Sequence, residues 1–385
     1  MADRGGQPRR QVVPEPMAHH LAPPRDIQGQ MKGAPVRVLG ILTVRNEGAF
    51  LLEWLAHHRA VGFTDFLVFS NDCDDGTDAM LDRLGDLGWL THICNDGPHA
   101  EGPQWAALKA ADRHPLMRTA DWAMVFDIDE FVNVRVGDGT LGALMAACPG
   151  AGGFAMTWRM FGNAGVVAMD DRPVLDSFVR CAPEVLHWPW RAQMVKTLFR
   201  NDGAFRKLGV HRPRSPDPDR IDSVVWVDGA GRPLPAGFVR NRVFTDPGSA
   251  PYGLVQLNHY ALGSMQGYLV KADRGRANRE ASAFDMGYWV ERNFDAAEDR
   301  GILRMAGRSA PLLAGLRADP VLGPLHDAAL RWRQARFAAL MQEEPWRALF
   351  GRLMLAPASR VLSADDARLI WQHGARRQGR EQTVS

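Results

Sequence analysis

The chain has 385 residues, of which 46% are hydrophobic and 23% charged, a balance typical of globular proteins and unlike that of disordered, collagenous or coiled-coil chains. Its 46 Lys and Arg residues nearly cancel its 44 Asp and Glu residues, leaving a formal net charge of +2. A dedicated nucleic-acid binder needs a basic surface to neutralise phosphates, so we expect no nucleic-acid partner.

The sequence also bears on cellular location. No apolar run reaches the roughly 18 residues of a membrane-spanning helix, and the first residues lack the apolar core of a secretory signal. The four cysteines form no CxxC pair and are too few for a disulfide framework in a chain of this length. We therefore expect reduced thiols in a cytoplasmic protein without a transmembrane segment. Peripheral association with the inner face of the membrane is compatible with this expectation.

Composition divides the chain into three parts. Residues 1–35 are rich in Pro, Gly, Gln and Arg without apolar periodicity, which is typical of a disordered leader. Residues 36–270 carry the regular apolar pattern of an α/β domain. Residues 271–385 are expected to be mainly helical and are rich in Arg.

Strands and helices are predicted to alternate from residue 36 onward. The nearly unbroken apolar run 36–44 is typical of a strand buried on both faces, and residues 50–62 follow as an amphipathic helix. Later strands are expected at residues 66–70, 89–95, 122–134, 152–162 and 193–200. The order β-α-β-α-β-α-β over the first four strands predicts a mostly parallel sheet with right-handed crossovers.

Two aspartates lie in the strand expected at 122–134. Asp127 and Asp129 are one residue apart, and in an ideal strand such positions point to the same side. Paired carboxylates suit Mg²⁺ or Mn²⁺, which complete their coordination with water and substrate phosphates. An acidic turn that caps the next segment explains the same pattern, and the residues alone leave both interpretations open.

Two further polar clusters follow the first two expected strands, at residues 45–47 and 71–78. Ligands of open α/β sheets bind beyond the carboxyl ends of the strands, so we expect these loops and the aspartate pair to converge on one crevice. Arg45 could clamp a ligand and Glu47 could accept its hydrogen bonds, while Asp and Asn of 71–78 could contact a base or ribose. Ordinary turn chemistry and helix capping are the competing explanations.

Residues further along the chain can complete such a crevice. Lys196, between apolar neighbours, offers a point charge to a phosphate, and His211 and His259 each offer a nitrogen to a metal ion. A basic cluster that could embrace a diphosphate consists of Lys271, Arg274 and Arg276. A snorkelling lysine, structural histidines and a solvated helix face are the alternatives.

Several catalytic motifs are absent from the sequence. It contains no GxGxxG after the first expected strand and no Walker A loop, which argues against a dinucleotide oxidoreductase and a P-loop enzyme. It also contains no GxSxG and no HExxH, the motifs of α/β-hydrolases and zinc metalloproteases.

The order of the motifs resembles the opening of a family-2-like glycosyltransferase. The similar bacterial subgroup carries an RNE…EW…H…G opening, an ND..DGT segment and a DIDEF metal motif. The matching residues here are Arg45, Asn46, Glu47, Glu53, Trp54, His58, Gly62, Asn71, Asp72, Asp75, Gly76, Thr77, Asp127, Ile128, Asp129, Glu130 and Phe131. Blocks at 158–165, 196–200 and 258–275 also resemble later parts of this group, and the resemblance covers roughly residues 36–280.

The resemblance implies a GT-A fold, which is a Rossmann-like, mostly parallel sheet flanked by helices, over residues 36–270. It also implies a nucleotide-diphosphate sugar donor and a Mn²⁺ or Mg²⁺ ion. With the basic residues named above, the expected nucleotide-sugar-binding residues are Arg45, Asn46, Glu47, Asp72, Asp75, Asp127, Lys196 and Lys271. The expected metal ligands are Asp127 and Asp129, with one of His211 and His259 completing the shell.

Family-2-like enzymes generally invert the anomeric centre, so a carboxylate should deprotonate the acceptor hydroxyl. The candidates are Glu130 and Glu184. The leading hypothesis is a metal-dependent transferase that acts on a glycan, lipid-linked or protein acceptor in surface polysaccharide assembly. One alternative is a non-catalytic nucleotide-sugar or carbohydrate-binding module on the same scaffold. Another is a nucleotidyltransferase, whose usual Gly-rich loop after the first strand is missing here.

Overall fold

The computed structural model describes residues 36–274 and 285–381, the last nine of these by their backbone only. The leader expected at 1–35 and the predicted site residue Arg276 lie outside the described residues. The strands are β1 (Val38–Val44), β2 (Asp65–Ser70), β3 (Thr91–Cys94), β4 (Trp122–Phe126), β5 (Glu130–Val134), β6 (Gly153–Met160), β7 (Arg180–Cys181), β8 (Val195–Arg200), β9 (Phe205–Lys207), β10 (Arg214–Pro216), β11 (Trp226–Asp228), β12 (Val255–His259) and β13 (Ala297–Glu298).

Helices connect and cover these strands. The α-helices are α1 (Gly48–Val61), α2 (Thr77–Asp86), α3 (Pro103–Ala111), α4 (Pro115–Thr119), α5 (Leu141–Ala147), α6 (Val174–Ser177), α7 (Ala236–Asn241), α8 (Met265–Arg274), α9 (Met286–Val290), α10 (Ala306–Ala318), α11 (Leu322–Leu340), α12 (Glu344–Leu355) and α13 (Ala364–Glu381). Short 3₁₀ turns are η1 (Trp190–Gln193), η2 (Ile221–Ser223) and η3 (Gly301–Met305). None of the helices in the described part of the chain combines the length and apolar character needed to cross a membrane.

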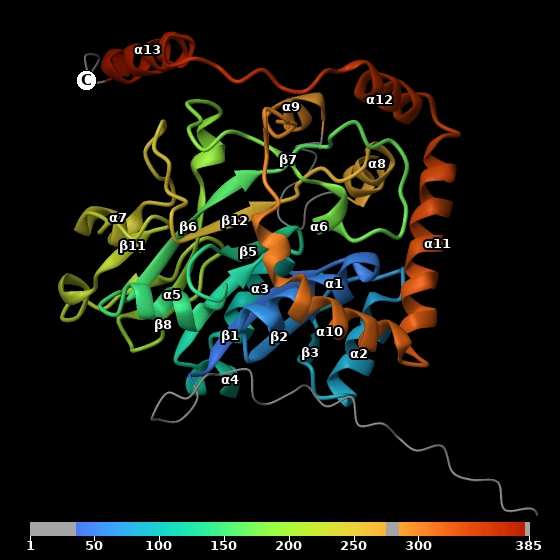
Figure 1. The fold of residues 1–385 in the computed structure, drawn as a ribbon, viewed down its shortest axis with the longest axis horizontal. Coiled ribbons are helices and arrows are strands. Elements are labelled where there is room, and N and C mark those ends of the chain that lie inside the picture. Colours follow the sequence, from blue (N-terminus) through green and yellow to red (C-terminus); the bar gives the residue numbers. More distant parts are fainter. Residues whose placement is uncertain (1–35, 275–284, 382–385) are drawn as a thin grey trace, which may run out of the picture.

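The main sheet has the strand order β3-β2-β1-β4-β8-β6-β12-β5, with β11 beside β6 (Figure 1). Strands β1 to β4 pair in parallel, and Ile41 of β1 lies opposite Leu67 of β2 and Val125 of β4. Strand β8 runs antiparallel to both of its neighbours, and β5 runs antiparallel to β12. The predicted mostly parallel sheet flanked by helices is therefore confirmed, as is the alternation of its first four strands with helices.

The single strand predicted at 122–134 is wrong, because a turn at Asp127, Ile128 and Asp129 divides it into β4 and β5. The backbone N–H of Glu130 donates to the Asp127 carbonyl at 3.1 Å, and the Glu130 carboxylate accepts the Asp127 N–H at 3.0 Å. After this turn the chain leaves β4 and pairs with β12 at the far side of the sheet. The strand argument that placed both aspartates on one side therefore does not apply, and the turn sets their directions.

Helix α1 is fastened to β5 by three side chains that point inward from one helix face. The Trp54 indole N–H donates to the Glu130 carbonyl at 3.1 Å. His57 contacts the Val132 carbonyl through Nε2 at 2.8 Å, and His58 accepts the Val132 N–H at its own Nε2 at 3.3 Å. All three side chains are essentially fully buried. They fix the position of the strand that directly follows the aspartate turn.

Helices α10 and α11 of the C-terminal region pack against the start of the sheet domain (Figure 1). Helix α10 contacts α1, and α11 contacts α1, α2 and α8. Arg83 of α2 forms an ion pair with Asp319 at 2.7 Å, and Asp319 also accepts the backbone N–H of Leu322 at the start of α11. The described residues after 270 are mainly helical as predicted, and the expected boundary after residue 270 falls inside α8.

The histidine contacts lead to a prediction about acid stability. Burial lowers the pKa of His57 to about 4 and holds the pKa of His58 well below its usual 6.5. At pH 7.5, His58→Leu should lower the free energy of unfolding by roughly 1–3 kcal/mol, because it removes the acceptor for a buried N–H. Urea unfolding of the wild type and the variant should show this deficit.

The deficit should shrink as the pH falls below 6.5. Only the wild type has an imidazole at position 58 that binds a proton on unfolding, so its stability decreases with falling pH by up to about 1.4 kcal/mol per pH unit. A deficit that stays constant from pH 7.5 to pH 4.5 would contradict the neutral, buried state of His58.

Candidate functional site

Two lysines, one fully buried and one half-buried, bind the aspartates of the turn between β4 and β5. Lys196 of β8 is fully buried, and its Nζ lies 3.0 Å from Asp127 Oδ2 and 3.4 Å from Glu130 Oε2. Lys271 of α8 places its Nζ 2.6 Å from Asp129 Oδ2. The structure thus brings together five predicted site residues, with the two aspartates contacting different lysines.

The charges of this cluster depend on one another. Burial alone would raise the pKa of Asp129, but the charge of Lys271 and the side-chain hydrogen bonds from His259 and Lys271 outweigh burial and hold that pKa well below its usual range. Burial would lower the pKa of Lys196, yet the facing carboxylates raise it. Burial raises the pKa of Glu130, which lies between other charges. Asp129 and Lys271 therefore form a half-buried, ionised pair.

Both predicted histidines lie beside this cluster. His259 of β12 has its Nε2 3.6 Å from Asp129 Oδ1, and its ring packs against Trp158 with the centroids 4.3 Å apart. The ring of His211 lies on the same tryptophan at 5.6 Å. Burial lowers the pKa of His211 to about 4 and also lowers the pKa of His259. Both imidazoles are therefore neutral near pH 7, which is the state that binds a metal ion.

The side chains around Asp129 include groups that can bind a divalent cation. In the described residues no group of three or more His, Cys, Asp and Glu side chains gathers as a ready metal site. The ionised Asp129 and the neutral His259 nevertheless offer an oxygen and a nitrogen 3.6 Å apart. This pair fits an ion that takes one or two protein ligands and fills the rest of its shell with water and phosphate, as Mg²⁺ does.

The loops after β1 and β2 interlock. Asn46 Oδ1 accepts the Asp74 N–H at 2.6 Å, and Asp75 Oδ2 accepts the Gly48 N–H at 3.0 Å. Asp75 also accepts the Thr77 N–H at 2.9 Å. Its carboxylate therefore binds backbone N–H groups, as expected if this segment is an ordinary turn. The remaining predicted residue of this region, Asp72, adopts a left-handed φ of 46° and its N–H donates to Asp96.

Arg274 links these loops to the aspartate turn. It forms an ion pair with Glu47 and donates to the Arg45 carbonyl at 2.7 Å. Arg274 lies one helical turn after Lys271, which binds Asp129. The three loops therefore lie together at one edge of the sheet, and α8 is the element that joins them.

A pocket of about 160 Å³ opens beside this junction. Its walls are the start of α1, the segment 166–178, helix α8 and the C-terminal helices α10 and α11. The predicted residues that line it are Glu47, Asp129 and Lys271, together with Arg274 of the basic cluster. Sequence reasoning gave no site role to the six other charged residues of its wall, which are Glu53, Asp170, Asp171, Arg172, Arg317 and Arg333.

Glu53 fastens the pocket wall to α1. Its carboxylate accepts the backbone N–H of Val174 at 2.7 Å and of Leu175 at 3.0 Å, at the start of α6. Burial raises the pKa of Glu53 to about 7, even though these amides favour its charged form. The signal that could have identified it is its place in the EW pair of the recognised motif.

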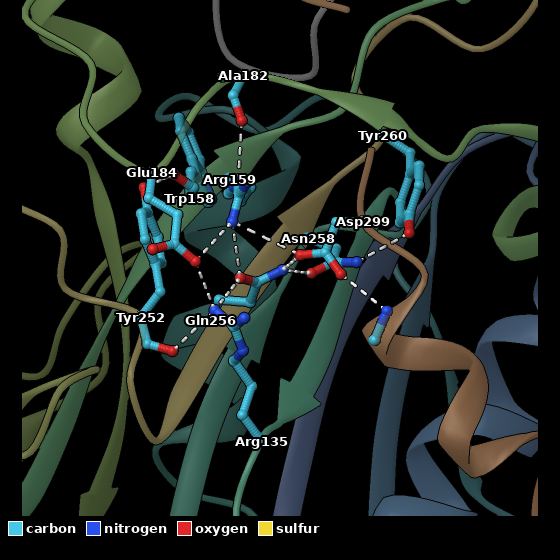
Figure 2. A network of polar contacts seen from close by, with 11 residues as sticks. Arg135, Trp158, Arg159, Ala182, Glu184, Tyr252, Gln256, Asn258, Tyr260 and Asp299 are labelled. Carbon is cyan, nitrogen blue, oxygen red and sulfur yellow. Dashed lines mark hydrogen bonds and ion pairs between the residues drawn. The ribbon is translucent and has the colours of Figure 1, made fainter. Parts of the chain in front are cut away.

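Glu184, a predicted base, lies elsewhere. It accepts hydrogen bonds from Arg135 at 3.0 Å and Arg159 at 3.4 Å, in the polar network that Figure 2 shows. Gln256 and Asn258 belong to the same network, whereas His259, the next residue of β12, contacts the Asp129 cluster. Because successive strand residues point to opposite faces, the network and the cluster lie on different sides of β12.

Comparison with known proteins gives partial matches. No family model matches the chain. A stretch of 116 residues, 29% of this chain, is 27% identical to a glycosyltransferase family 92 protein of Ricinus communis and covers 20% of that protein. A stretch of 94 residues is 26% identical to a glycosyltransferase family 92 protein of Oryza sativa subsp. japonica, covering 23% of this chain and 15% of that one. The matches span a fifth or less of these relatives and carry the family 92 name, not that of family 2.

Solved structures give weaker likenesses. TarS of S. aureus (residues 1–349, with UDP) matches 80% of this chain and 92% of its own at 12% identity and a TM-score of 0.31. The core-mannan synthase A of Aspergillus fumigatus, in its Mn/GDP form, matches 43% of this chain and 52% of its own at 13% identity and a TM-score of 0.23.

Glu53 leads to a prediction about the pH dependence of stability. A carboxyl whose pKa rises from 4.5 to about 7 on folding keeps its proton longer in the native state than in the unfolded state. Native stability should therefore fall as the pH rises through this range. Relative to Glu53→Gln, the wild type should lose roughly 3 kcal/mol of unfolding free energy between pH 4.5 and pH 8.

Urea titrations of both proteins across this pH range measure the effect. The exposed Glu343 provides the matched control, and Glu343→Gln should follow the wild type. If the difference between wild type and Glu53→Gln did not change with pH, the assignment of a protonated Glu53 would be incorrect.

Proposed function

We propose that this chain is a glycosyltransferase that moves a sugar from a nucleotide-diphosphate donor to an acceptor hydroxyl. The proposal rests on one observation, the meeting of the loops after β1, β2 and β4 around Lys271 and Arg274 of α8. This meeting occurs at the carboxyl edge of a mostly parallel sheet, where open α/β folds bind nucleotides. The family 92 names of the curated relatives support the same class of activity.

In this proposal the donor lies across the loops, with the sheet domain in the GT-A arrangement. Residues of the RNE and NDCDDGT loops line the nucleotide, and Lys271 and Arg274 face the diphosphate. Both cations now contact carboxylates, Asp129 and Glu47, so a bound diphosphate would share or replace these partners. Positive charge at this point stabilises the nucleoside diphosphate as it leaves.

The residues that would hold a Mn²⁺ or Mg²⁺ ion are Asp129 and His259, with Asp127 nearby. When bound, such an ion would add positive charge to the diphosphate and lower its basicity as a leaving group. Lys196 holds the Asp127 carboxylate in place from the interior.

Three carboxylates are candidates for the general base of an inverting transfer. Glu130 is fully buried and occupied by Lys196 and by the Trp158 indole N–H at 2.7 Å. Glu184 belongs to the network on the other side of β12. Glu53 lines the pocket with a pKa near neutrality, which suits a general base. We therefore add Glu53 to the two predicted candidates.

One observation favours a non-catalytic nucleotide-sugar-binding module instead. Each of these carboxylates is already engaged by protein donors, so none is poised in the present structure to take a proton from an acceptor. Such a module would bind the donor without releasing its sugar. If the chain is a transferase, we expect it to act in surface glycan assembly.

Substitution of Asp129 tests the transferase proposal. Asp129→Asn keeps the shape of the side chain but removes the charge that orients Lys271 and would hold the metal ion. Turnover should fall on the order of 100-fold or more, the size of effect that follows loss of one electrostatic contact to developing charge. The assay is release of nucleoside diphosphate from UDP-sugars and GDP-sugars with Mn²⁺, with and without EDTA.

The exposed Asp138 supplies the control, since Asp138→Asn changes the same group in a turn away from the pocket. Full activity of Asp129→Asn, or of the wild type in EDTA, would contradict the role of the metal ion. Donor binding by calorimetry without any sugar release would favour the binding module.

A further inference from the structure

The charged side chains that line the pocket are almost all matched with a partner. The ion pairs among them are Glu47 with Arg274, Asp129 with Lys271, Asp170 with Arg172, and Asp171 with Arg317. Two charged lining residues are left over. Glu53 is held by backbone amides and has a pKa near neutrality, so Arg333 carries the unbalanced charge.

Arg333 is on α11, in the C-terminal helical region. Its side chain is only 6% exposed, and no carboxylate in the described part of the chain lies within ion-pair distance of it. Its guanidinium lies 4.7 Å from the ring centroid of Phe50, and Nη2 donates to the Gly267 carbonyl at a long 3.4 Å. A guanidinium has five N–H donors, and no carboxylate in the described residues accepts a hydrogen bond from those of Arg333.

A buried arginine without an anionic partner destabilises the folded state. Burying a charge without a partner costs far more than the single long hydrogen bond and the contact with Phe50 return. Burial also lowers the pKa of Arg333 below its usual value, so the neighbouring charges do not compensate for the lost water. The pocket in front of the side chain is the place where a compensating anion can bind.

We propose that Arg333 binds an anionic group of a substrate, a phosphate or a carboxylate, inside this pocket. The planar fork of a guanidinium matches both anions with two parallel hydrogen bonds. A Cβ at Gly267 would lie 3.0 Å from Ser264 Oγ and 3.4 Å from Arg333 Nη2, so glycine lets α8 pack closely beside the guanidinium. The Phe50 ring, with its centroid 4.7 Å from the guanidinium carbon, supports the group from one side.

This inference rests on the proposed function and gives the C-terminal helices a part in it. The anion has two sources. It is either the diphosphate of the donor or an acidic group on the acceptor, such as a uronate or a sugar phosphate. The apolar wall near Arg333, which includes Phe50 and Leu330, suits the body of a sugar ring.

The test compares Arg333→Gln, Arg333→Lys and Arg333→Met with Arg331→Gln. Arg331 lies on the same helix and is exposed, so it is a matched control for loss of one arginine from α11. Thermal shift and calorimetry are measured with four probes at equal concentration: UDP, glucose 1-phosphate, glucuronate and neutral glucose. Bound anion appears as added stability of the native state.

At least one anionic probe should raise the melting temperature of the wild type and of Arg331→Gln. This gain should be absent in the Gln and Met variants and partly kept in the Lys variant, with an affinity loss of at least about 10-fold. Dependence on UDP identifies the donor diphosphate as the source, and dependence on glucose 1-phosphate or glucuronate identifies the acceptor. Arg333→Met without probe should melt no lower than the wild type, because it removes a buried unpaired charge.

The inference is overturned if no anionic probe gives a gain that depends on Arg333, or if neutral glucose gives the same gain. It is also overturned if Arg333→Met unfolds, because the arginine would then be structural. The proposed function fails separately, through the absence of nucleotide binding and sugar release in the wild type. Donor binding that ignores Arg333, together with no Arg333-dependent gain from glucose 1-phosphate or glucuronate, would leave the transferase proposal intact and reject the anion site.

Discussion

Two lysines at the carboxyl edge of the sheet, the buried Lys196 and the half-buried Lys271, determine how the rest of the site is arranged. Lys196 reaches the turn between β4 and β5 from β8, and Lys271 reaches it from α8. Each lysine binds one aspartate. A buried carboxylate without a cation would give up its charge or destabilise the fold. The lysines therefore stabilise a partly buried acidic turn, and they place it beside α8, where Arg274 holds the loop after β1.

Much of the fold follows from local sequence pattern. The parts that could not be predicted this way share one cause. The apolar run that becomes β1 and the aspartates at the strand end were readable from residues near one another in sequence. The turn that separates β4 from β5 was not, because apolar residues continue on both sides of it, at Phe126 and Phe131. What redirects the chain is pairing with β12, more than 120 residues later. Long-range pairing leaves no local signature.

The same reasoning applies to the candidate site. The loops after β1, β2 and β4 meet at α8, whereas Glu184 lies on the other side of β12, and several predicted residues make contacts within the fold. Trp54 and His58 of the recognised motif fasten α1 to β5, and Asp75 caps the backbone at Gly48. These motif residues position the residues that face the pocket. Arg333 gave no signal, since one arginine in an Arg-rich helix looks like a solvated residue until the packing of α11 against α1 is known.

The pairing of charges in the pocket sets a condition on any ligand that enters it. Lys271 and Arg274 are neutralised by Asp129 and Glu47, so an incoming diphosphate must compete with protein carboxylates there. At Arg333 no such competition exists, because no described carboxylate is paired with it. An anion gains most where its charge replaces no existing partner, since only there is the full cost of a buried cation relieved. By this argument the C-terminal helix α11 is part of the binding site as well as a support for α1.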